Sequence, residues 1–372
     1  MKSIKIVSYI HPSRTYLPCS GVGRHVNNLL LSLNQKQSTE LSLLFSLQWL
    51  EEDGKLPINA PLRELPYKIF SKNERVMERS WKALNRPKMD SYVDGDWLFS
   101  PVETRFPVKN KRTAITIHDL QAFETDLPWS STIEHQKFKK RWGLWVKKAA
   151  RQADIVFTVS EFTRGRLIDL LDLDENKVKI SGNAIDPVFL GQLSKISAKE
   201  TTFPYIAVIG GLRLKKGGNE ILALASKLNT EWPEMKLVIW GENEPDLIEK
   251  ANEIGNIISQ NMISDEEMIS WLKGSFASLF LSWYEGFGIP ILEAMACGVP
   301  VISSNKASLP EAAGDGAYLV SPDDTEHIFD LLKELKKPEK RLDLIKRGFV
   351  NIERFSWDKC AENVVNALAN FN

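Results

Sequence analysis

Residues 282–304 read SWYEGFGIPILEAMACGVPVISS, and this stretch decides the fold. The apolar run that ends at Leu281 predicts a strand, and the two glycines of Glu285-Gly-Phe-Gly predict a tight loop, because glycine allows backbone angles that a Cβ forbids. Pro290 suits the first turn of a helix, which the turn at Gly298 ends before another apolar strand. Strand, loop, helix and strand in this order predict an α/β fold with a parallel sheet.

Two carboxylates flank the loop, with seven residues between them. Glu285 lies at the strand end, and Glu293 is expected in the first helical turn. The free N–H groups and the dipole of a helix start attract anions, and a carboxylate can accept two hydrogen bonds from a vicinal diol. Sugar or ribose hydroxyls are therefore natural partners. The alternative is structural, with Glu285 capping the loop and Glu293 interacting favourably with the helix dipole.

The bulk properties predict a two-domain globular protein in a reducing compartment. A length of 372 residues suits two domains, and 43% apolar residues can build both cores. We expect no transmembrane helix and no signal peptide, because no long uninterrupted apolar run is present. The three scattered cysteines favour neither a disulfide framework nor a cysteine zinc site, which indicates the cytoplasm.

Charge is divided unevenly along the chain. Residues 1–190 hold 29 Lys/Arg and 22 Asp/Glu, a balance of +7, and the remaining residues balance it with −7. A basic half and an acidic half indicate domains with different partners. Nucleic acid is not an expected partner, because the basic half contains no recognised binding motif.

The first half opens in the manner of a nucleotide-binding fold. A strand at 5–9 is followed by a glycine loop at 20–24, which contains Gly21 and Gly23, and then by leucines at helical spacing. A Gly-x-Gly alone is a weak dinucleotide signal, and a tight packing turn is the alternative. A later strand ends in His118-Asp119, where open α/β sheets place ligand contacts. Residues 50–96 are expected to be irregular.

The second half opens with a basic glycine loop after a strand at 205–209. Residues 210–218 hold four glycines and three cations, Arg213, Lys215 and Lys216. Close backbone approach combined with several positive charges suits a diphosphate. A solvated basic turn is the alternative.

The segment from Glu285 to Pro300 resembles the Glu-x(7)-Glu signature of the retaining glycosyltransferases of family four, and similar segments recur along almost the whole chain. The resemblance is weakest at about 48–96. It implies the GT-B fold, in which two Rossmann-like domains face each other across a cleft and a C-terminal helix crosses back to the first domain. The implied domains are 1–190 for the acceptor, 191–355 for the nucleotide sugar, and 356–372 for the returning helix.

The resemblance also implies roles for individual residues. Glu285 would orient the donor sugar and offset its growing positive charge, His118 would contact that sugar, and Lys216 would stabilise the leaving diphosphate together with Arg213. Glu293 would hold the ribose. Gly211 stands where the family commonly has arginine, so Arg213 or Lys215 would substitute. The remaining expected substrate contacts are Gly21, Gly23, Gly211, Lys215, Ile258, Gly286, Phe287, Gly288, Ile289 and Pro290.

The implied reaction is retaining transfer of a hexose from a nucleotide diphosphate sugar to a saccharide acceptor in polysaccharide biosynthesis. UDP-glucose is the first expectation for the donor, and a GDP-mannose-dependent mannosyltransferase is the alternative. A sugar-nucleotide epimerase of the same fold and a non-catalytic sugar-nucleotide binder are rivals. No cofactor and no metal are expected. Asp-x-Asp sequences occur at 94–96 and 172–174, but cations already serve the diphosphate.

The location of the enzyme is a separate expectation. Two basic stretches that carry tryptophan, 72–88 and 137–151, lie in the first half. Phe138, Trp142, Trp145 and Ala149 share one helical face, which is either a core face or a surface that docks on anionic lipid. We therefore expect a cytoplasmic enzyme with peripheral contact to the inner membrane face, acting on a lipid-linked saccharide.

Overall fold

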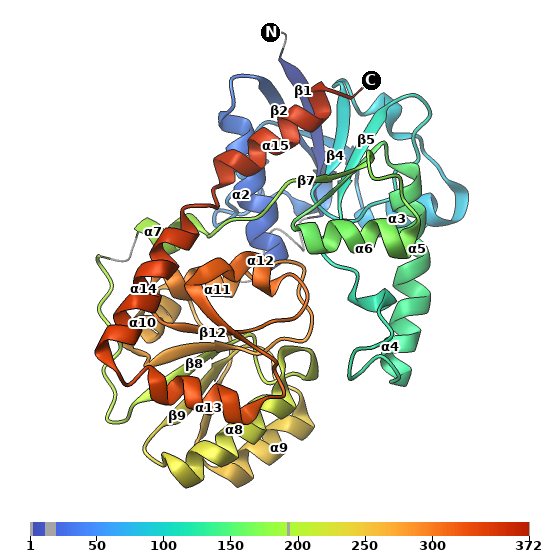
Figure 1. The fold of residues 1–372 in the computed structure, drawn as a ribbon. Helices are drawn as coiled ribbons and strands as arrows, with labels where there is room; N and C mark the ends of the chain where they lie inside the picture. The colour runs from blue at the N-terminus through green and yellow to red at the C-terminus, as the bar shows by residue number, and fades with distance from the viewer. Residues whose placement is uncertain (1–2, 12–19, 192–193, 372) are drawn as a thin grey trace. The chain divides into compact units, whose positions relative to one another are not determined.

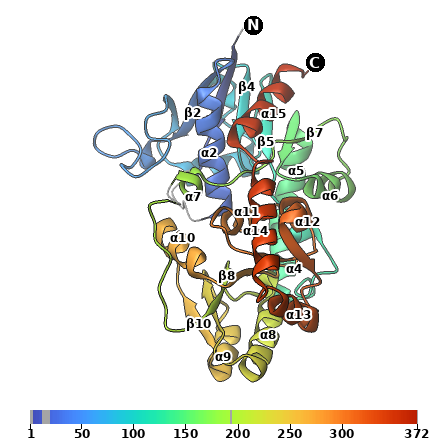
Figure 2. The same ribbon diagram turned by 60° about the vertical axis from the view of Figure 1, so that its left-hand side comes forward.

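The computed structural model describes residues 3–11, 20–191 and 194–371, and these form two compact units (Figures 1 and 2). The first unit contains the described parts of Met1–Phe123, Ile133–Ala184 and Ser356–Asn372. The second contains Glu124–Thr132 and the described parts of Ile185–Phe355. The second unit thus includes one short segment, Glu124–Thr132, from the first half of the chain.

The first unit is built on a seven-stranded parallel sheet in the order β3-β2-β1-β4-β5-β6-β7. Its strands β4 and β6, neither of which is an edge strand, are buried at every residue, as expected for a parallel sheet covered on both faces. The strands are β1 (Ile4–Tyr9), β2 (Thr39–Ser46), β3 (Tyr67–Ser71), β4 (Trp97–Ser100), β5 (Arg112–Thr116), β6 (Ile155–Thr158) and β7 (Val178–Ile180).

One helix of the first unit, α3, lies where the sequence analysis expected an irregular segment, and another, α2, begins earlier than expected. The hydroxyl of Ser20 accepts a hydrogen bond of 2.9 Å from the Gly23 N–H, so the expected glycine loop is the capped first turn of α2. The helices are α2 (Gly21–Gln35), α3 (Glu74–Leu84), α4 (Ile133–Phe138), a π-helical turn (Lys139–Gly143), α5 (Leu144–Gln152), α6 (Glu161–Leu171) and α15 (Trp357–Ala369). Because β3 and α3 lie within 50–96, the expectation of an irregular segment there was wrong.

The second unit has a six-stranded parallel sheet in the order β10-β9-β8-β11-β12-β13. Its strands are β8 (Tyr205–Ile209), β9 (Lys236–Trp240), β10 (Ile257–Gln260), β11 (Ala277–Phe280), β12 (Val301–Ser304) and β13 (Ala317–Val320). Its helices are α7 (Pro187–Gly191), α8 (Gly218–Glu231), α9 (Pro245–Ile254), α10 (Asp265–Gly274), α11 (Ile289–Ala296), α12 (Leu309–Ala313), α13 (Thr325–Glu334) and α14 (Pro338–Ile352).

Each sheet reverses its strand order at one point. The reversal lies between β1 and β4 in the first sheet and between β8 and β11 in the second. Loops that leave neighbouring strands in opposite directions open a crevice at the carboxyl ends of those strands, and open α/β sheets bind ligands there. The topology therefore places one candidate site in each unit. Two Rossmann-like parallel sheets confirm the predicted fold class.

The last helix returns to the first unit, as predicted. Helix α15 packs against α2, and both figures show the two helices side by side. Trp357, Val364 and Leu368 are buried in this packing, and Lys36 pairs with Asp358 at 2.6 Å. The first unit therefore contains segments from both the first and the last part of the described chain.

In the described part of the chain, no helix is both long enough and apolar enough to cross a bilayer.

Candidate functional site

The basic glycine loop of the second unit follows β8 and is shaped by close backbone contacts. Gly211 and Gly217 both have a φ of +78°, which L side chains rarely adopt. A Cβ on Gly211 would lie 1.8 Å from the backbone oxygen of Glu242, and one on Gly217 would lie 2.4 Å from that of Leu281. The glycines thus let this loop pack against the loops that follow β9 and β11.

The loop between β11 and α11 is fixed by hydrogen bonds and by one strained glycine. The Ser308 hydroxyl donates to the backbone oxygens of Glu285, at 2.8 Å, and Phe287, at 3.0 Å. Gly288 caps α11 with a φ of +116°. Ile289 and Pro290 are the first two residues of the helix. The sequence analysis assigned no role to Ser308, which lies directly before a short helix.

Lys216 and Glu285 form an ion pair at the carboxyl ends of β8 and β11. The Lys216 Nζ lies 2.5 Å from Oε1 of Glu285, and the two side chains are only 16% and 18% exposed. Burial alone would raise the pKa of Glu285, but the positive charges of Lys216 and Lys215 hold it below its usual value. Glu285 therefore carries its negative charge at neutral pH. The structure brings together the two residues that the sequence analysis assigned to catalysis in this unit.

The other two cations of the basic loop have different surroundings. Arg213 pairs with Glu242 at 3.1 Å, a partner that the sequence analysis missed. The backbone oxygen of Lys215 accepts from the Trp283 N–H at 3.0 Å, which ties the basic loop to the loop that carries Glu285. Of the two candidates to replace the missing arginine, Lys215 is the one whose charge acts on Glu285.

Glu293 is in the second turn of α11, not in the first turn as expected, because the helix begins at Ile289. Its side chain is only 3% exposed. Burial, and after it the negative charge of Glu293, raises the pKa of the Cys297 thiol to about 12. Contact between Glu293 and a ribose stays a prediction, as does contact between Ile258, a half-buried residue of β10, and a base.

In the first unit, His118 follows β5 and packs edge-on against His25, with 4.7 Å between ring centroids. The Nε2 of His118 donates to the backbone oxygen of Pro101 at 2.9 Å. His25 is fully buried, and burial, helped by the charge of His118, holds its pKa well below the usual value. Since His25 lies on α2 just after Gly21 and Gly23, the structure brings the first-unit candidates to the same helix start.

A cavity of about 330 Å³ opens at the carboxyl ends of β1 and β4 in the first unit. The Nε1 of Trp142 donates to Glu103 at 3.3 Å, and Lys82 lies 5.0 Å from the ring centre of Trp145. The lining residues are Tyr9, His11, Glu78, Lys82, Val102, Glu103, Thr104, Trp142 and Trp145. The sequence analysis missed this cavity, since its residues come from four separate segments.

The wall of this cavity rests on a buried carboxylate. Glu74 accepts hydrogen bonds from the Tyr9 hydroxyl and from the Trp49 indole. Burial raises the pKa of Glu74, and these two hydrogen bonds oppose the shift. The network fixes Tyr9, which is one of the lining residues, to the start of α3.

The two Asp-x-Asp sequences have structural roles. Asp96 accepts from the Lys5 N–H at 2.9 Å, and Asp94 pairs with Lys68. Asp172 ends α6 with a left-handed backbone, and Asp174 accepts from the Asn176 N–H at 2.7 Å. Within the described ranges, no group of three or more His, Cys, Asp or Glu side chains could hold a metal ion. A metal-independent reaction stays a prediction.

Family models and curated relatives match most of the chain. A family model described as glycosyl transferases group 1 matches residues 191–351, and one described as Glycosyltransferase Family 4 matches residues 19–189. O-antigen chain mannosyltransferase B of Escherichia coli is 24% identical over 389 residues, 98% of this chain and 99% of that protein. O-antigen chain mannosyltransferase RfbU of Salmonella typhimurium is 23% identical over 325 residues, 82% and 86% of the two chains.

Solved structures agree on the fold. A glycosyltransferase from Rickettsia africae matches with a TM-score of 0.68 at 14% identity and covers both chains completely. WaaG, a glycosyltransferase involved in lipopolysaccharide biosynthesis, matches with a TM-score of 0.69 at 12% identity over 98% of this chain and 100% of that one. At such identities the likeness shows the fold alone, which is GT-B.

Proposed function

Because the chain belongs to the group 1 glycosyltransferases, we propose that it transfers a hexose from a nucleotide diphosphate sugar to a saccharide acceptor, with retention at the anomeric carbon. The observation that carries the proposal is the Lys216–Glu285 pair at the strand reversal of the second unit. A cation suits the leaving diphosphate and a carboxylate suits the sugar as it becomes positive. The buried pair offers both charges at the same place.

The residues contribute to the barrier in different ways. Lys216, aided by Arg213 and Lys215, stabilises negative charge on the departing diphosphate, and one well-placed donor is worth about 3–4 kcal/mol. Glu285 stays ionised because Lys216 and Lys215 lower its pKa. No covalent nucleophile is required, because in a same-face attack the leaving phosphate takes the acceptor proton.

Mannose is the sugar that we propose, because two relatives that match most of the chain are named as mannosyltransferases. UDP-glucose, the first expectation from the sequence, is the alternative donor. The same names support a role in polysaccharide biosynthesis.

Product analysis tests the function and its rivals. The enzyme is incubated with GDP-mannose or UDP-glucose, with and without a mannose oligosaccharide, and the products are separated and their anomeric signals read by NMR. Transfer with an α-linkage from an α-linked donor supports the proposal. Free nucleotide with altered sugar stereochemistry in the absence of acceptor would identify an epimerase, and an inverted linkage would refute retention.

Substitution of the two glutamates should change different kinetic and binding constants. Glu285→Gln should mainly lower turnover, because its charge matters most as the sugar becomes cationic, whereas Glu293→Gln should raise the donor dissociation constant. Lys216→Ala should weaken binding of the nucleoside diphosphate and slow turnover. Calorimetry with GDP and UDP gives the affinities. If all three variants lowered only the donor affinity and left turnover unchanged, the separate roles of these residues would be contradicted.

We also propose that the cavity at β1 and β4 in the first unit receives the acceptor. Its indoles offer apolar platforms and its carboxylates, Glu78 and Glu103, accept hydrogen bonds from sugar hydroxyls. Trp145→Ala should raise the acceptor KM about tenfold and leave the donor KM unchanged. The matched control is Leu84→Ala, an exposed change on the neighbouring α3. Equal effects on both substrates would contradict an acceptor role.

Peripheral membrane contact is proposed from α4 and α5, with a correction to the residues involved. Trp142 and Trp145 are half-buried and pack against the core, so they are not the docking residues. Ile133 and Leu144 are instead 67% and 61% exposed beside a run of lysines and arginines. Exposed apolar side chains among cations suit the headgroup region of an anionic bilayer, where a lipid-linked acceptor would lie.

Vesicle flotation tests this contact. We expect the protein to float with phosphatidylglycerol vesicles at low salt and to be released at high salt, because each cation contributes about 1 kcal/mol near an anionic surface. Ile133→Ser with Leu144→Ser should weaken flotation, whereas Leu342→Ser, an exposed change on α14, should not. Absence of flotation at low salt would remove the membrane proposal and leave the transferase proposal standing.

A further inference from the structure

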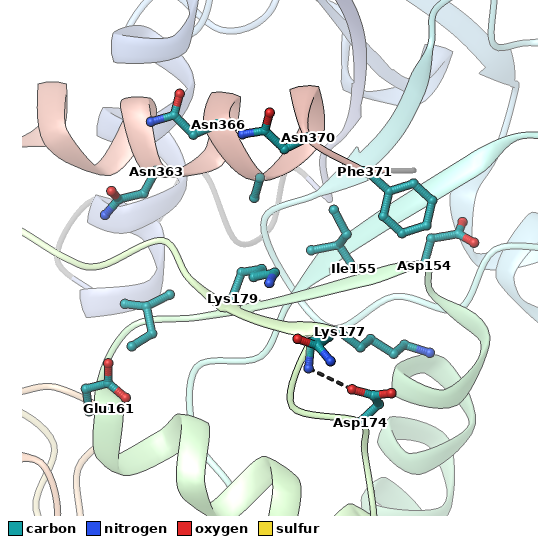
Figure 3. A pocket seen from close by; sticks show the side chains of 13 residues that line it. Asp154, Ile155, Glu161, Asp174, Lys177, Lys179, Asn363, Asn366, Asn370 and Phe371 are labelled. Carbon is teal, nitrogen blue, oxygen red and sulfur yellow. Dashed lines mark hydrogen bonds between the residues drawn. The ribbon is translucent and has the colours of Figure 1, made fainter.

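A groove in the first unit lies away from the strand reversal, along the edge strand β7. Its volume is about 930 Å³, within the range of ligand sites, and it is open to solvent. Figure 3 shows α15 along one side and the strand with Lys177 and Lys179 along the other, with Phe371 near one end and Glu161 near the opposite end. We call this cavity the α15–β7 groove. No step of the proposed reaction uses it.

Asparagine amides dominate the helix side of the groove. Asn363 and Asn366 on α15 and Asn370 at its C-cap recur at helical spacing, so they extend about 10 Å along the helix axis. Asn363 donates to the backbone oxygen of Ser181 at 3.3 Å. In the described ranges no hydrogen bond is recorded for the side chains of Asn366 and Asn370, which are exposed. Two amides that each donate and accept are thus free for a ligand.

Charge in the groove is balanced and mostly engaged. The Asp154 carboxylate accepts from the N–H of Thr113 at 2.7 Å, and that of Asp174 accepts from the backbone of Asn176. Lys177 donates to the backbone oxygen of Arg151 at 2.8 Å, and burial lowers its pKa. No concentrated field of either sign remains, so the groove does not suit a phosphate, a nucleotide or an acidic peptide.

One end of the groove carries a fixed aromatic ring. Phe371 packs edge-on against Trp97 at 5.2 Å, and the guanidinium of Arg112 lies 5.2 Å from its centre. A pyranose offers both an apolar face for such a ring and hydroxyls for amides. Strand β7 has three residues and carries Lys179, with Lys177 directly before it, which discourages the addition of a peptide strand to this edge.

We propose that the α15–β7 groove binds a neutral segment of the polysaccharide that the enzyme extends. This inference rests on the proposed function, because the occupant is the product chain. When one part of the polysaccharide is bound in the groove, its acceptor end stays near the enzyme at a high effective concentration. Binding of that end then becomes an intramolecular event, and no new contact at the reacting atoms is needed. The groove would thereby favour long acceptors over short ones.

Affinity electrophoresis of the full chain tests the groove without any donor. The protein is run through gels that contain yeast α-mannan or dextran, and retardation gives the apparent dissociation constant. We expect retardation by at least one polymer and an approximately tenfold weaker affinity for the double variant Asn366→Leu, Asn370→Leu, because two hydrogen bonds are lost. Asn252→Leu, an exposed asparagine on α9, is the matched control and should behave like wild type.

A second variant and a kinetic readout keep the proposal open to refutation. Ala367→Arg, which places a long side chain in the groove, should reduce retardation as well. In transfer assays the double variant should keep wild-type turnover on a short acceptor and lose the advantage of a long one. No retardation of wild type, or equal retardation of all variants, overturns the groove. Failure of transfer with intact retardation would instead refute the proposed function alone.

Discussion

Glu285 keeps its charge in a nearly enclosed position because cations surround it. Lys216 lies 2.5 Å away and Lys215 adds a second positive charge, and together they outweigh the cost of burial. Removing Lys216 would leave Glu285 as a buried, unpaired carboxylate. The free energy of folding lost in this way exceeds the stabilisation that the ion pair provides. Variants that remove both charges together, such as Lys216→Met with Glu285→Gln, therefore separate loss of chemistry from loss of folding.

His25 should make the first unit less stable in mild acid. Its folded pKa is well below 6.5 because of burial and the neighbouring His118. Below pH 6.5 the unfolded chain therefore binds a proton that the folded chain does not. The stability that neutral His25 provides is present above pH 6.5 and is lost as pH falls, by up to about 1.4 kcal/mol per pH unit.

Hydrogen exchange in β1 and β4 between pH 5 and pH 8, corrected for intrinsic rates, measures this dependence. His25→Gln should flatten it below pH 6.5 whatever its effect on absolute stability. Parallel curves for wild type and variant would show that another group is responsible.

At the residue scale, sequence patterns identified side chains with unusual local chemistry but not their partners. Glu285 and Lys216 stood out because glycines and cations cluster around them. Ser308, Glu242 and His25 carry no such mark, since each matters only through a neighbour that is distant in sequence. Such pairs are created by the topology of the sheets.

The basic glycine loop depends on one close approach that alanine would prevent. Gly217→Ala places a Cβ 2.4 Å from the Leu281 oxygen and also strains a φ of +78°. Gly255, at the end of α9, has a φ of +81° and open space around it, so it is a matched control in the same unit. Gly255→Ala should cost about 1–2 kcal/mol of unfolding free energy from strain alone.

Gly217→Ala should cost about 1–3 kcal/mol more than the control, because the neighbouring backbone must move. Urea unfolding followed by hydrogen exchange in β8 and β11 gives both values. Equal costs for the two variants would mean that the loop adjusts freely around Leu281.

At the element scale, the sequence predicted α11 and its flanking strands because glycine and proline mark both ends of a strongly apolar segment. It failed at α3, whose exposed face is rich in charge and whose buried residues are only Glu74 and Trp81. It also missed the π-helical turn at Lys139–Gly143. The periodic stripe itself was informative, because Trp142, Trp145 and Ala149 pack in the core of the first unit, which is the core-face alternative of the sequence analysis.

For the whole molecule, α15 is a structural part of the first unit. Leu368 is buried against that unit, so Leu368→Ala should cost about 2–5 kcal/mol through the cavity that it leaves. Leu84→Ala, at an exposed position of the same unit, should stay within about 0.5 kcal/mol of wild type. Protection of β1 and β4 in hydrogen exchange under urea measures both, and a small effect of Leu368→Ala would show that α15 is loosely attached.

The return of α15 has a consequence for biogenesis. Ribosomes add about 5–20 residues per second, so roughly ten to forty seconds separate synthesis of the residues around 184 from synthesis of α15. During that interval the nascent first unit exposes the apolar surface of α2 that Trp357, Val364 and Leu368 later cover. The second unit is synthesised completely before α15, so it can finish folding before the first unit does, although the first unit begins earlier in the chain.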